Sequence, residues 1–188
     1  MVSRLLHAIG LGIVGAGIVH IAVLLLLPAY SQNDVWSHLS ASAQPYTPVR
    51  LEASASGRTS TLSNPFLKAA ACQFDLADGV LHLSAQSRLP FWSVSIYDPS
   101  GLNIVSLTDR AANSPALDLV VASPAQMGRL RIGPPEDLER SAFVETAVEQ
   151  GFAVVRIFVP DETWEGLADA FLGALTCTPR RLGSEGVG

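Results

Sequence analysis

The chain has 188 residues, which is enough for one domain and a small appendage. It is 48% hydrophobic and only 15% charged, and its net charge at pH 7 is −5. An acidic chain of this kind lacks the basic stripe that nucleic-acid binding requires and the polybasic cluster that holds a protein on anionic lipid. We therefore expect no nucleic-acid partner.

The N-terminal part of the chain predicts a membrane anchor over residues 1–30. Its apolar core, residues 8–27, spans roughly 30 Å as a helix, which is the hydrocarbon thickness of a bilayer. A signal peptide usually has only about 7–15 apolar residues, so the length favours an uncleaved anchor over that alternative. Arg4 precedes the run and Asp34 is the first charge after it. The positive-inside rule then predicts a single pass through a bacterial inner membrane, with a cytoplasmic N-terminus and a periplasmic C-terminal domain.

One face of the predicted anchor carries Gly12, Ala16 and His20, which are spaced by four residues. Small residues in this pattern permit close contact between membrane helices. His20 is the only strongly polar group in the span, and such groups tend to face a partner or a cavity. The alternatives are that glycine is common in membrane spans and that a neutral imidazole bonds to its own helix. Contact between helices is therefore a hypothesis for these three residues.

Residues 31–64 are polar and rich in Ser, Ala and Pro. The stretch SQNDVWSHLS predicts a short juxtamembrane helix capped by Asn33 or Asp34, and the remainder predicts a linker. We expect the β-rich domain to extend over residues 65–188.

Alternating apolar and polar residues after Pro65 predict seven or eight short strands. The predicted strands are 69–76, 80–85, 91–98, 103–110, 117–123, 129–132, 141–148 and 152–159. The last two are expected to form a hairpin. Residues 162–175 then have helical spacing, with Pro179 as the expected end of the helix. The predicted fold is mainly β: an antiparallel β-sandwich or partly open barrel with a C-terminal helix.

Cys72 and Cys177 are 105 residues apart, and neither has a second cysteine nearby for a zinc or redox pair. In an oxidising periplasm they could form one disulfide. Two buried free thiols are the alternative. The even count and the expected location favour the disulfide.

The stretch FWSVSIYDPSGLNIVSLTDR, residues 91–110, collects the candidate ligand-binding residues Trp92, Asp98, Asp109 and Arg110. In a hairpin with Pro99–Gly101 at its tip, Asp98 lies beside the turn, where its carboxylate can accept backbone N–H groups as an Asx-turn. Asp109 and Arg110 lie at the other end, near Trp92. A structural role for Asp98 is favoured, and a cleft walled by Trp92 with Asp109 and Arg110 as polar anchors is the functional alternative.

Known catalytic and metal-binding patterns are missing from the sequence. It contains no G-x-S-x-G elbow and no P-loop, and Lys68 is its only lysine. The histidines have no local metal-ligand spacing, and His82 on the polar side of a strand predicts an exposed or hydrogen-bonded side chain. We expect no cofactor and no metal, and a non-enzymatic role is favoured.

At PFLKAAACQFDLADG, FWSVSIYDPSGLNIVSLTDR and GFAVVRIFVP the chain resembles the small membrane-anchored members of the domain-of-unknown-function families 1254 and 1214 of alphaproteobacteria. The stretch GIVHIAVLLLLP extends the resemblance to the N-terminus. The family has no established biochemical activity. The resemblance implies cysteines at positions 72 and 177. It also implies a second small anchored protein that carries the companion family's domain as a partner.

Two functions follow as hypotheses. The first is a non-catalytic, membrane-tethered binding or assembly module whose association energy lies in apolar contacts. The second is a small-ligand receptor or enzyme that uses Asp109 and Arg110 beside Trp92.

Overall fold

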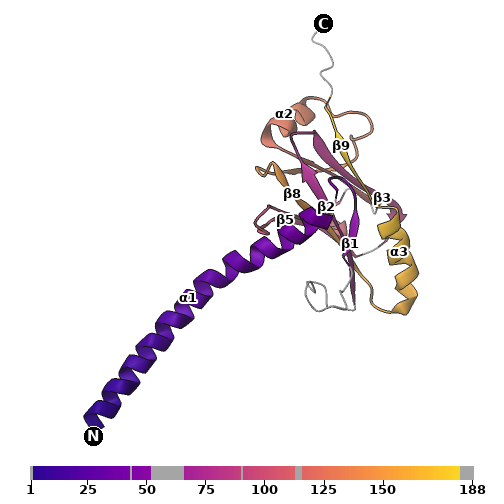
Figure 1. The fold of residues 1–188 in the computed structure, drawn as a ribbon. Coiled ribbons are helices and arrows are strands. Elements are labelled where there is room, and N and C mark those ends of the chain that lie inside the picture. Colours follow the sequence, from indigo (N-terminus) through magenta and orange to yellow (C-terminus); the bar gives the residue numbers. More distant parts are fainter. Residues whose placement is uncertain (1, 43, 52–65, 90, 113–115, 183–188) are drawn as a thin grey trace.

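The N-terminal apolar run forms one uninterrupted helix, α1 (Val2–Ser42), in the computed structural model of the chain. The structure describes residues 2–42, 44–51, 66–89, 91–112 and 116–182. The segment Val2–Leu26 has a mean hydropathy of 2.5 and none of it is buried, so by length and composition it could cross a membrane or act as a signal sequence. Figure 1 shows α1 extending away from the β-domain.

The separate juxtamembrane helix predicted to start at Asn33 or Asp34 is instead the continuation of α1 to Ser42. No glycine follows Gly17 until Gly57, so the sequence offers no glycine to end the helix just after the apolar run. Helix α1 continues through Pro28 and Asn33 to Ser42. The segment predicted as a linker also contributes a strand, β1, to the β-domain.

The β-domain consists of two sheets packed face to face, which confirms the predicted mainly β fold. The five-stranded sheet, sheet A, has the order β1 (Val49–Leu51), β2 (Leu67–Asp75), β8 (Gln150–Phe158), β4 (Trp92–Tyr97) and β5 (Asn103–Thr108). The four-stranded sheet, sheet B, has the order β7 (Ala142–Glu145), β6 (Ala116–Ala122), β3 (Val80–Arg88) and β9 (Thr176–Arg180). All pairs are antiparallel except β6 with β7.

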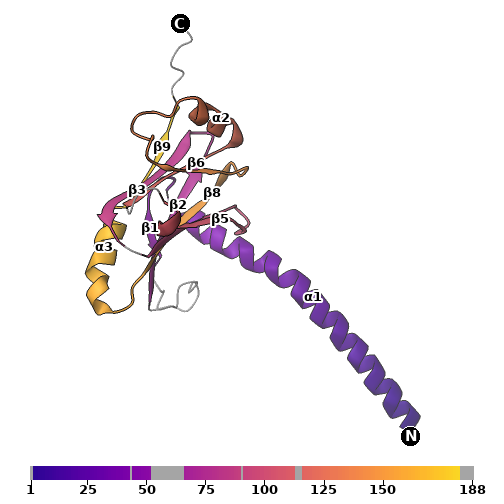
Figure 2. The ribbon, with the colours of Figure 1, turned by 180° about the vertical axis from the view of Figure 1, so that it is seen from behind.

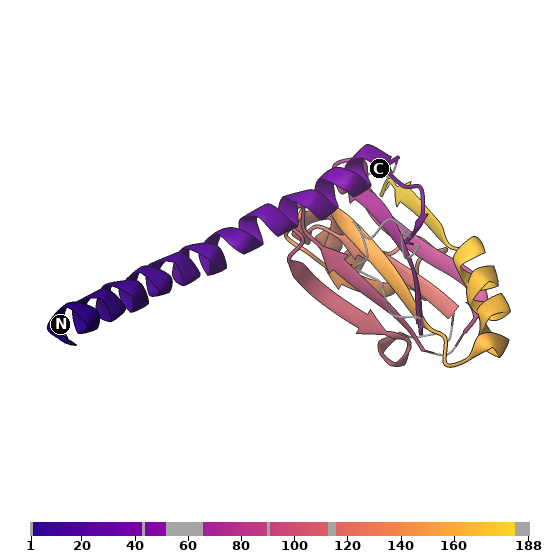
Figure 3. The same cartoon turned by 60° about the horizontal axis from the view of Figure 1, so that its bottom comes forward.

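The core lies between the two sheets and follows the predicted alternation. Trp92, Val94 and Ile96 of β4 are each 3% exposed or less and face the core, as expected. Helix α3 (Glu165–Gly173) adds Ala168 and Phe171 to the same core. In Figures 2 and 3 α3 lies against the side of the β-domain that is farther from the N-terminus of α1.

Residues 129–132, predicted as a strand, lie instead in helix α2 (Pro124–Ile132). Ser123 and Gln126 form a capping box at its start, and Pro124 occupies the first turn. These signals for a helix start are stronger than the short apolar alternation of residues 129–132, so this stretch is helical. Met127 and Leu130 then cover Val120 on the outer face of sheet B.

The hairpin predicted from residues 141–148 and 152–159 does not form. β7 pairs in parallel with β6 in sheet B, whereas β8 lies between β2 and β4 in sheet A. The connection crosses between the layers, with Thr146 N–H bonded to Ala122 and Leu76 N–H bonded to Glu149. A strand such as β8, buried on both faces, favours the centre of a sheet over a hairpin edge.

The last helix ends at Gly173 and not near Pro179, because residues 176–180 form β9. This strand is an edge of sheet B, where a proline is tolerated. β9 carries Cys177, which is joined to Cys72 of β2 in a disulfide with a Cα–Cα distance of 6.6 Å. The bond therefore links sheet B to sheet A.

We predict that replacing both cysteines, as C72A/C177A, lowers the free energy of unfolding by about 2–4 kcal/mol, because the disulfide restricts the unfolded chain. The measurement is urea denaturation of the full chain in detergent. Reducing agent should destabilise the wild type by a similar amount and leave the double variant unchanged. Equal stability of oxidised wild type and double variant would contradict an inter-sheet bond that stabilises the fold.

Candidate functional site

Asp98 has the structural role that the sequence favoured. Its carboxylate oxygen Oδ1 accepts the N–H groups of Ser100 at 2.8 Å and Leu102 at 2.9 Å, and the Ser100 hydroxyl at 2.6 Å. The Ser100 hydroxyl holds the pKa of Asp98 below its ordinary value, against the effect of burial, and the backbone N–H groups add to the lowering. Asp98 thus closes the turn between β4 and β5.

The other three candidate residues lie at the opposite end of this hairpin. The pairing of Ser93 with Thr108 places Asp109 and Arg110, in a 3₁₀ turn that follows β5, near the start of β4. Trp92 is 3% exposed and belongs to the core, so it offers little surface to a ligand. The structure therefore brings Asp109 and Arg110 near Trp92 in space but separates all three from Asp98. A ligand at these residues stays a prediction.

A second polar cluster, which sequence reasoning missed, lies on the outer face of sheet A. Arg156 of the central strand β8 donates from Nη1 to Ser95 Oγ at 3.1 Å and from Nη2 to the Tyr97 hydroxyl at 2.8 Å. Ser95 Oγ lies 2.9 Å from Ser106 Oγ, and Asn103 Nδ2 donates to Ser106 at 3.0 Å. We call these five residues the Arg156 cluster.

Electrostatics within the Arg156 cluster favour negative charge. Burial acts to raise the pKa of Tyr97, but hydrogen bonds from Asn103 and Arg156 and the charge of Arg156 outweigh it, so that the pKa lies below its ordinary value. The Arg156 guanidinium carbon also lies 5.6 Å from the centre of the Tyr97 ring.

A third polar group joins strands of sheet B. Asp118 Oδ1 lies 3.0 Å from His82 Nε2 and accepts the Ser141 hydroxyl at 2.6 Å. A nucleophilic triad needs the histidine between the acid and the hydroxyl, whereas here the carboxylate is central. The arrangement ties β3, β6 and the start of β7 together, and His82 is hydrogen-bonded, as predicted. Within the described parts of the chain, no group of three or more His, Cys, Asp and Glu side chains could hold a metal ion.

Asp169 connects α3 to the edge of sheet A. It pairs with Lys68 at 2.9 Å and with Arg50 at 3.0 Å, and its backbone oxygen accepts a further bond from Arg50. The Lys68 ammonium, followed by the charge of Arg50, keeps the pKa of Asp169 below its ordinary value. The only lysine of the chain is thus engaged in an ion pair, which argues against its use as a neutral amine nucleophile.

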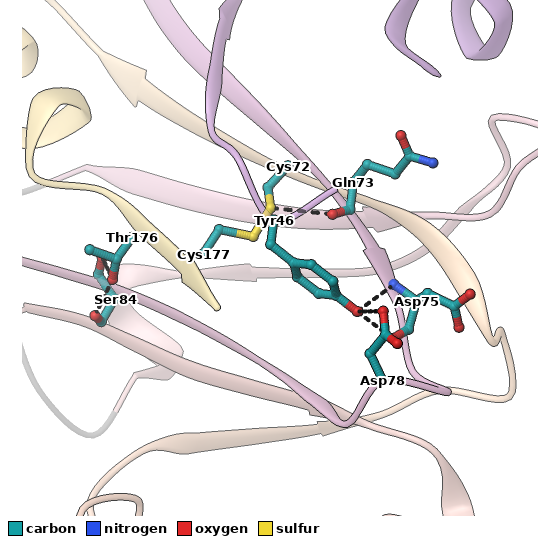
Figure 4. Close-up of a disulfide and its surroundings, with 8 residues drawn as sticks. All are labelled: Tyr46, Cys72, Gln73, Asp75, Asp78, Ser84, Thr176 and Cys177. Carbon is teal, nitrogen blue, oxygen red and sulfur yellow. Dashed lines mark hydrogen bonds between the residues drawn. A yellow bond between two sulfur atoms is a disulfide. The ribbon is translucent and has the colours of Figure 1, made fainter. Parts of the chain in front are cut away.

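Tyr46 fastens the segment between α1 and β1 to the β-domain (Figure 4). Its hydroxyl donates to the backbone oxygen of Asp75 at 2.5 Å and lies 3.0 Å from the Asp78 carboxylate, and it accepts the Asp75 N–H at 3.1 Å. Its backbone N–H bonds Gln73, and its ring packs against the core that contains Cys177. Burial raises the pKa of Tyr46 to about 12, with Asp78 adding to the shift and the Asp75 backbone opposing it.

The predicted helix-contact residues Gly12, Ala16 and His20 lie in the apolar half of α1 and are exposed in the single chain. A methyl group added at Gly12 would meet nothing within 4 Å. Contact between anchor helices stays a prediction.

We predict that Tyr46→Phe lowers the free energy of unfolding by about 1–2 kcal/mol at pH 8, because the hydroxyl bonds are lost. From pH 10 to about 12 the unfolded chain releases the Tyr46 proton while the folded chain keeps it, so this contribution is lost as the pH rises. The difference between wild type and Y46F in urea denaturation should therefore narrow between pH 8 and pH 11.

Tyr97→Phe provides a control, because its effect on stability should change with pH in the opposite direction. Because the folded pKa of Tyr97 lies below its ordinary value, the folded chain releases this proton first, and the Tyr97 contribution grows as the pH rises toward 10. The difference between wild type and Y97F should widen over that range. A Tyr46 contribution that is the same at pH 8 and pH 11 would show that the Tyr46 hydroxyl does not fasten this segment.

The family model described as "Protein of unknown function (DUF1254)" matches residues 47–179. Among solved structures, the chain is similar to the VPA0106 protein from Vibrio parahaemolyticus, with 12% identity and a TM-score of 0.50. This match covers 62% of the present chain and 28% of the other. A second similar structure, an uncharacterized protein from Burkholderia cenocepacia, has 16% identity and a TM-score of 0.38, with 51% and 27% of the two chains covered.

At these identities the likeness concerns the fold alone, and the chain spans less than a third of either protein's length. A comparison with curated proteins gives no match. The resemblance to family 1254 is confirmed, while the companion family 1214, the alphaproteobacterial source and the membrane anchoring stay predictions. With most of the β-domain inside the matched region, the chain belongs to the DUF1254 family.

Proposed function

We propose that the chain is a membrane-tethered, non-catalytic binding module whose β-domain lies in the bacterial periplasm. The observation that carries the proposal is that an apolar helix of membrane-spanning length leads into a domain whose two sheets are joined by a disulfide. Disulfides persist in oxidising compartments such as the periplasm. The helix acts as an anchor, with Arg4 on the cytoplasmic side.

The attachment of residues 44–51 to the β-domain supports a tethering role. Tyr46 and β1 attach the segment after α1 to β2, and the ion pairs of Asp169 attach β1 and β2 to α3. A domain attached in this way holds its binding surface at a defined place near the membrane. Its partner is a second small anchored protein that carries the companion family's domain, and the longer solved relative, of which this chain spans 28%, is compatible with a fold that works beside further structure.

The binding role is favoured over the small-ligand receptor or enzyme at Asp109 and Arg110. Trp92, the expected wall of that site, is buried in the core, and the described side chains provide no hydrogen-bond partner that orients Asp109 or Arg110. Catalytic groups are usually oriented by a second group within hydrogen-bond reach.

We predict that crosslinking of the full chain in native membranes captures one small membrane-anchored protein with a companion-family domain. The double variant D109A/R110A should capture it equally well, because these residues are not needed for binding. The measurement is mass spectrometry of the crosslinked product. Loss of capture in the double variant would favour the alternative site, and capture of no anchored protein by the wild type would refute the binding module.

A further inference from the structure

Arg156 occupies an unusual electrostatic position in the β-domain. It lies on the central strand of sheet A, in register with Ala69 on one side and Ser93 on the other. It is partly buried, and both of its hydrogen-bond acceptors, Ser95 and Tyr97, are neutral hydroxyls. Partly buried arginines usually pair with a carboxylate, because the charge is costly to desolvate alone.

Among the described residues, no carboxylate pairs with Arg156. The ion pairs among the described residues involve Arg50, Lys68, His82, Arg131 and Arg180, and none involves Arg156. Asp75 has a carboxylate on the outer face of sheet A, but it binds Gln150 at the other end of β8. Gln150 is six residues from Arg156, which is about 20 Å along a strand. The positive charge of Arg156 is therefore uncompensated in the described part of the protein.

The Arg156 cluster also has more donors than acceptors. A guanidinium has five N–H donors, and the bonds to Ser95 and Tyr97 leave three of them without a partner among the described residues. The Tyr97 oxygen accepts a bond from Arg156, and its hydrogen bonds with Asn103 and Ser95 also lower its pKa. What is missing from the cluster is an acceptor with negative charge.

We propose that the Arg156 cluster is a binding site for an oxyanion, a carboxylate or phosphate group, on the outer face of sheet A. Arg156 supplies the charge and N–H donors, and Tyr97 supplies a hydroxyl donor. Ser95, Ser106 and Asn103 hold these two side chains in place through their own hydrogen bonds. Arginine and tyrosine donors suit both groups, because each offers several acceptor oxygens.

This site deepens the proposed function and rests on it, since it names the chemistry that the tethered module recognises. The oxyanion has two sources near a membrane: a free solute or a lipid headgroup. A purely structural Arg156, which only ties β8 to β4, predicts no anion binding. The three possibilities give different results in one set of titrations.

The test uses the full chain, first in dodecyl maltoside micelles, which carry no phosphate or carboxylate. Inorganic phosphate and acetate are titrated by calorimetry at constant ionic strength. We expect saturable binding of at least one of them by the wild type. Arg156→Gln should weaken it by about 10- to 100-fold, the range expected for charged hydrogen bonds. Arg156→Lys should bind the anion more tightly than Arg156→Gln but more weakly than the wild type. Tyr97→Phe should weaken anion binding less than Arg156→Gln does.

Arg129→Gln is the matched control, because Arg129 is an exposed arginine on α2 whose side chain has no ion pair within the described part of the chain. It should bind like the wild type. The titration is then repeated in lipid discs that contain phosphatidylglycerol. Unchanged wild-type affinity identifies a free solute as the source. A fall to the R156Q level in the same discs identifies a headgroup that already fills the site.

Two results would overturn the proposal: no binding of either anion by wild type in micelles, or equal binding by wild type and R156Q. Urea denaturation of each variant verifies that it folds, and Y97F provides a second test if R156Q does not. Crosslinking separates this proposal from the proposed function. If the chain captures the anchored partner but binds no anion, the oxyanion site is refuted while the proposed function as a binding module still stands.

Discussion

The disulfide between β2 and β9 is the contact on which the arrangement of the β-domain most depends. It joins the two sheets beside the edge where sheet A has only the three-residue strand β1 and sheet B ends in β9. A short edge of this kind leaves a core poorly covered. Tyr46 packs over the core on this side, and α3 contributes Phe171 to it, so that three elements distant in sequence close one edge.

Closing this edge also attaches the segment that follows α1 to the β-domain. Because Tyr46 bonds the end of β2 and β1 continues sheet A, the segment after α1 belongs to the folded domain. The ion pairs of Asp169 with Arg50 and Lys68 add a second attachment between this edge and α3. Residues 44–51 are therefore held against the β-domain at two places, by Tyr46 and by Arg50.

Sequence patterns predicted the parts of the fold that depend on local alternation. The β4–β5 hairpin, its Asx-turn at Asp98 and the inward face of Trp92, Val94 and Ile96 all follow from spacing within twenty residues. The errors concern partners that are distant in sequence. The pattern of residues 141–159 predicted a hairpin. Instead, β8 lies at the centre of sheet A, between β2 and β4, because both of its faces can be buried.

The difficulty of predicting contacts between residues distant in sequence also explains why the Arg156 cluster was missed. The predicted residues were those that one hairpin brings together, whereas the Arg156 cluster needs β8 to insert beside β4, some sixty residues earlier. One signal was available in the sequence: Arg156 is the only charged residue within the apolar run FAVVRIFV. A lone charge in a strand with two buried neighbours is costly, so it merits a search for the group that compensates it.

We propose that the β-domain is anchored and exported, and the redox state of its two cysteines shows whether it lies in an oxidising compartment. Intact cells that express the full chain are treated with acid to trap thiols, and the unfolded protein is labelled with a maleimide of high mass. We expect no labelling of Cys72 or Cys177 unless a reductant is added first. Labelling of both cysteines without reductant would place the domain in a reducing compartment and contradict its export.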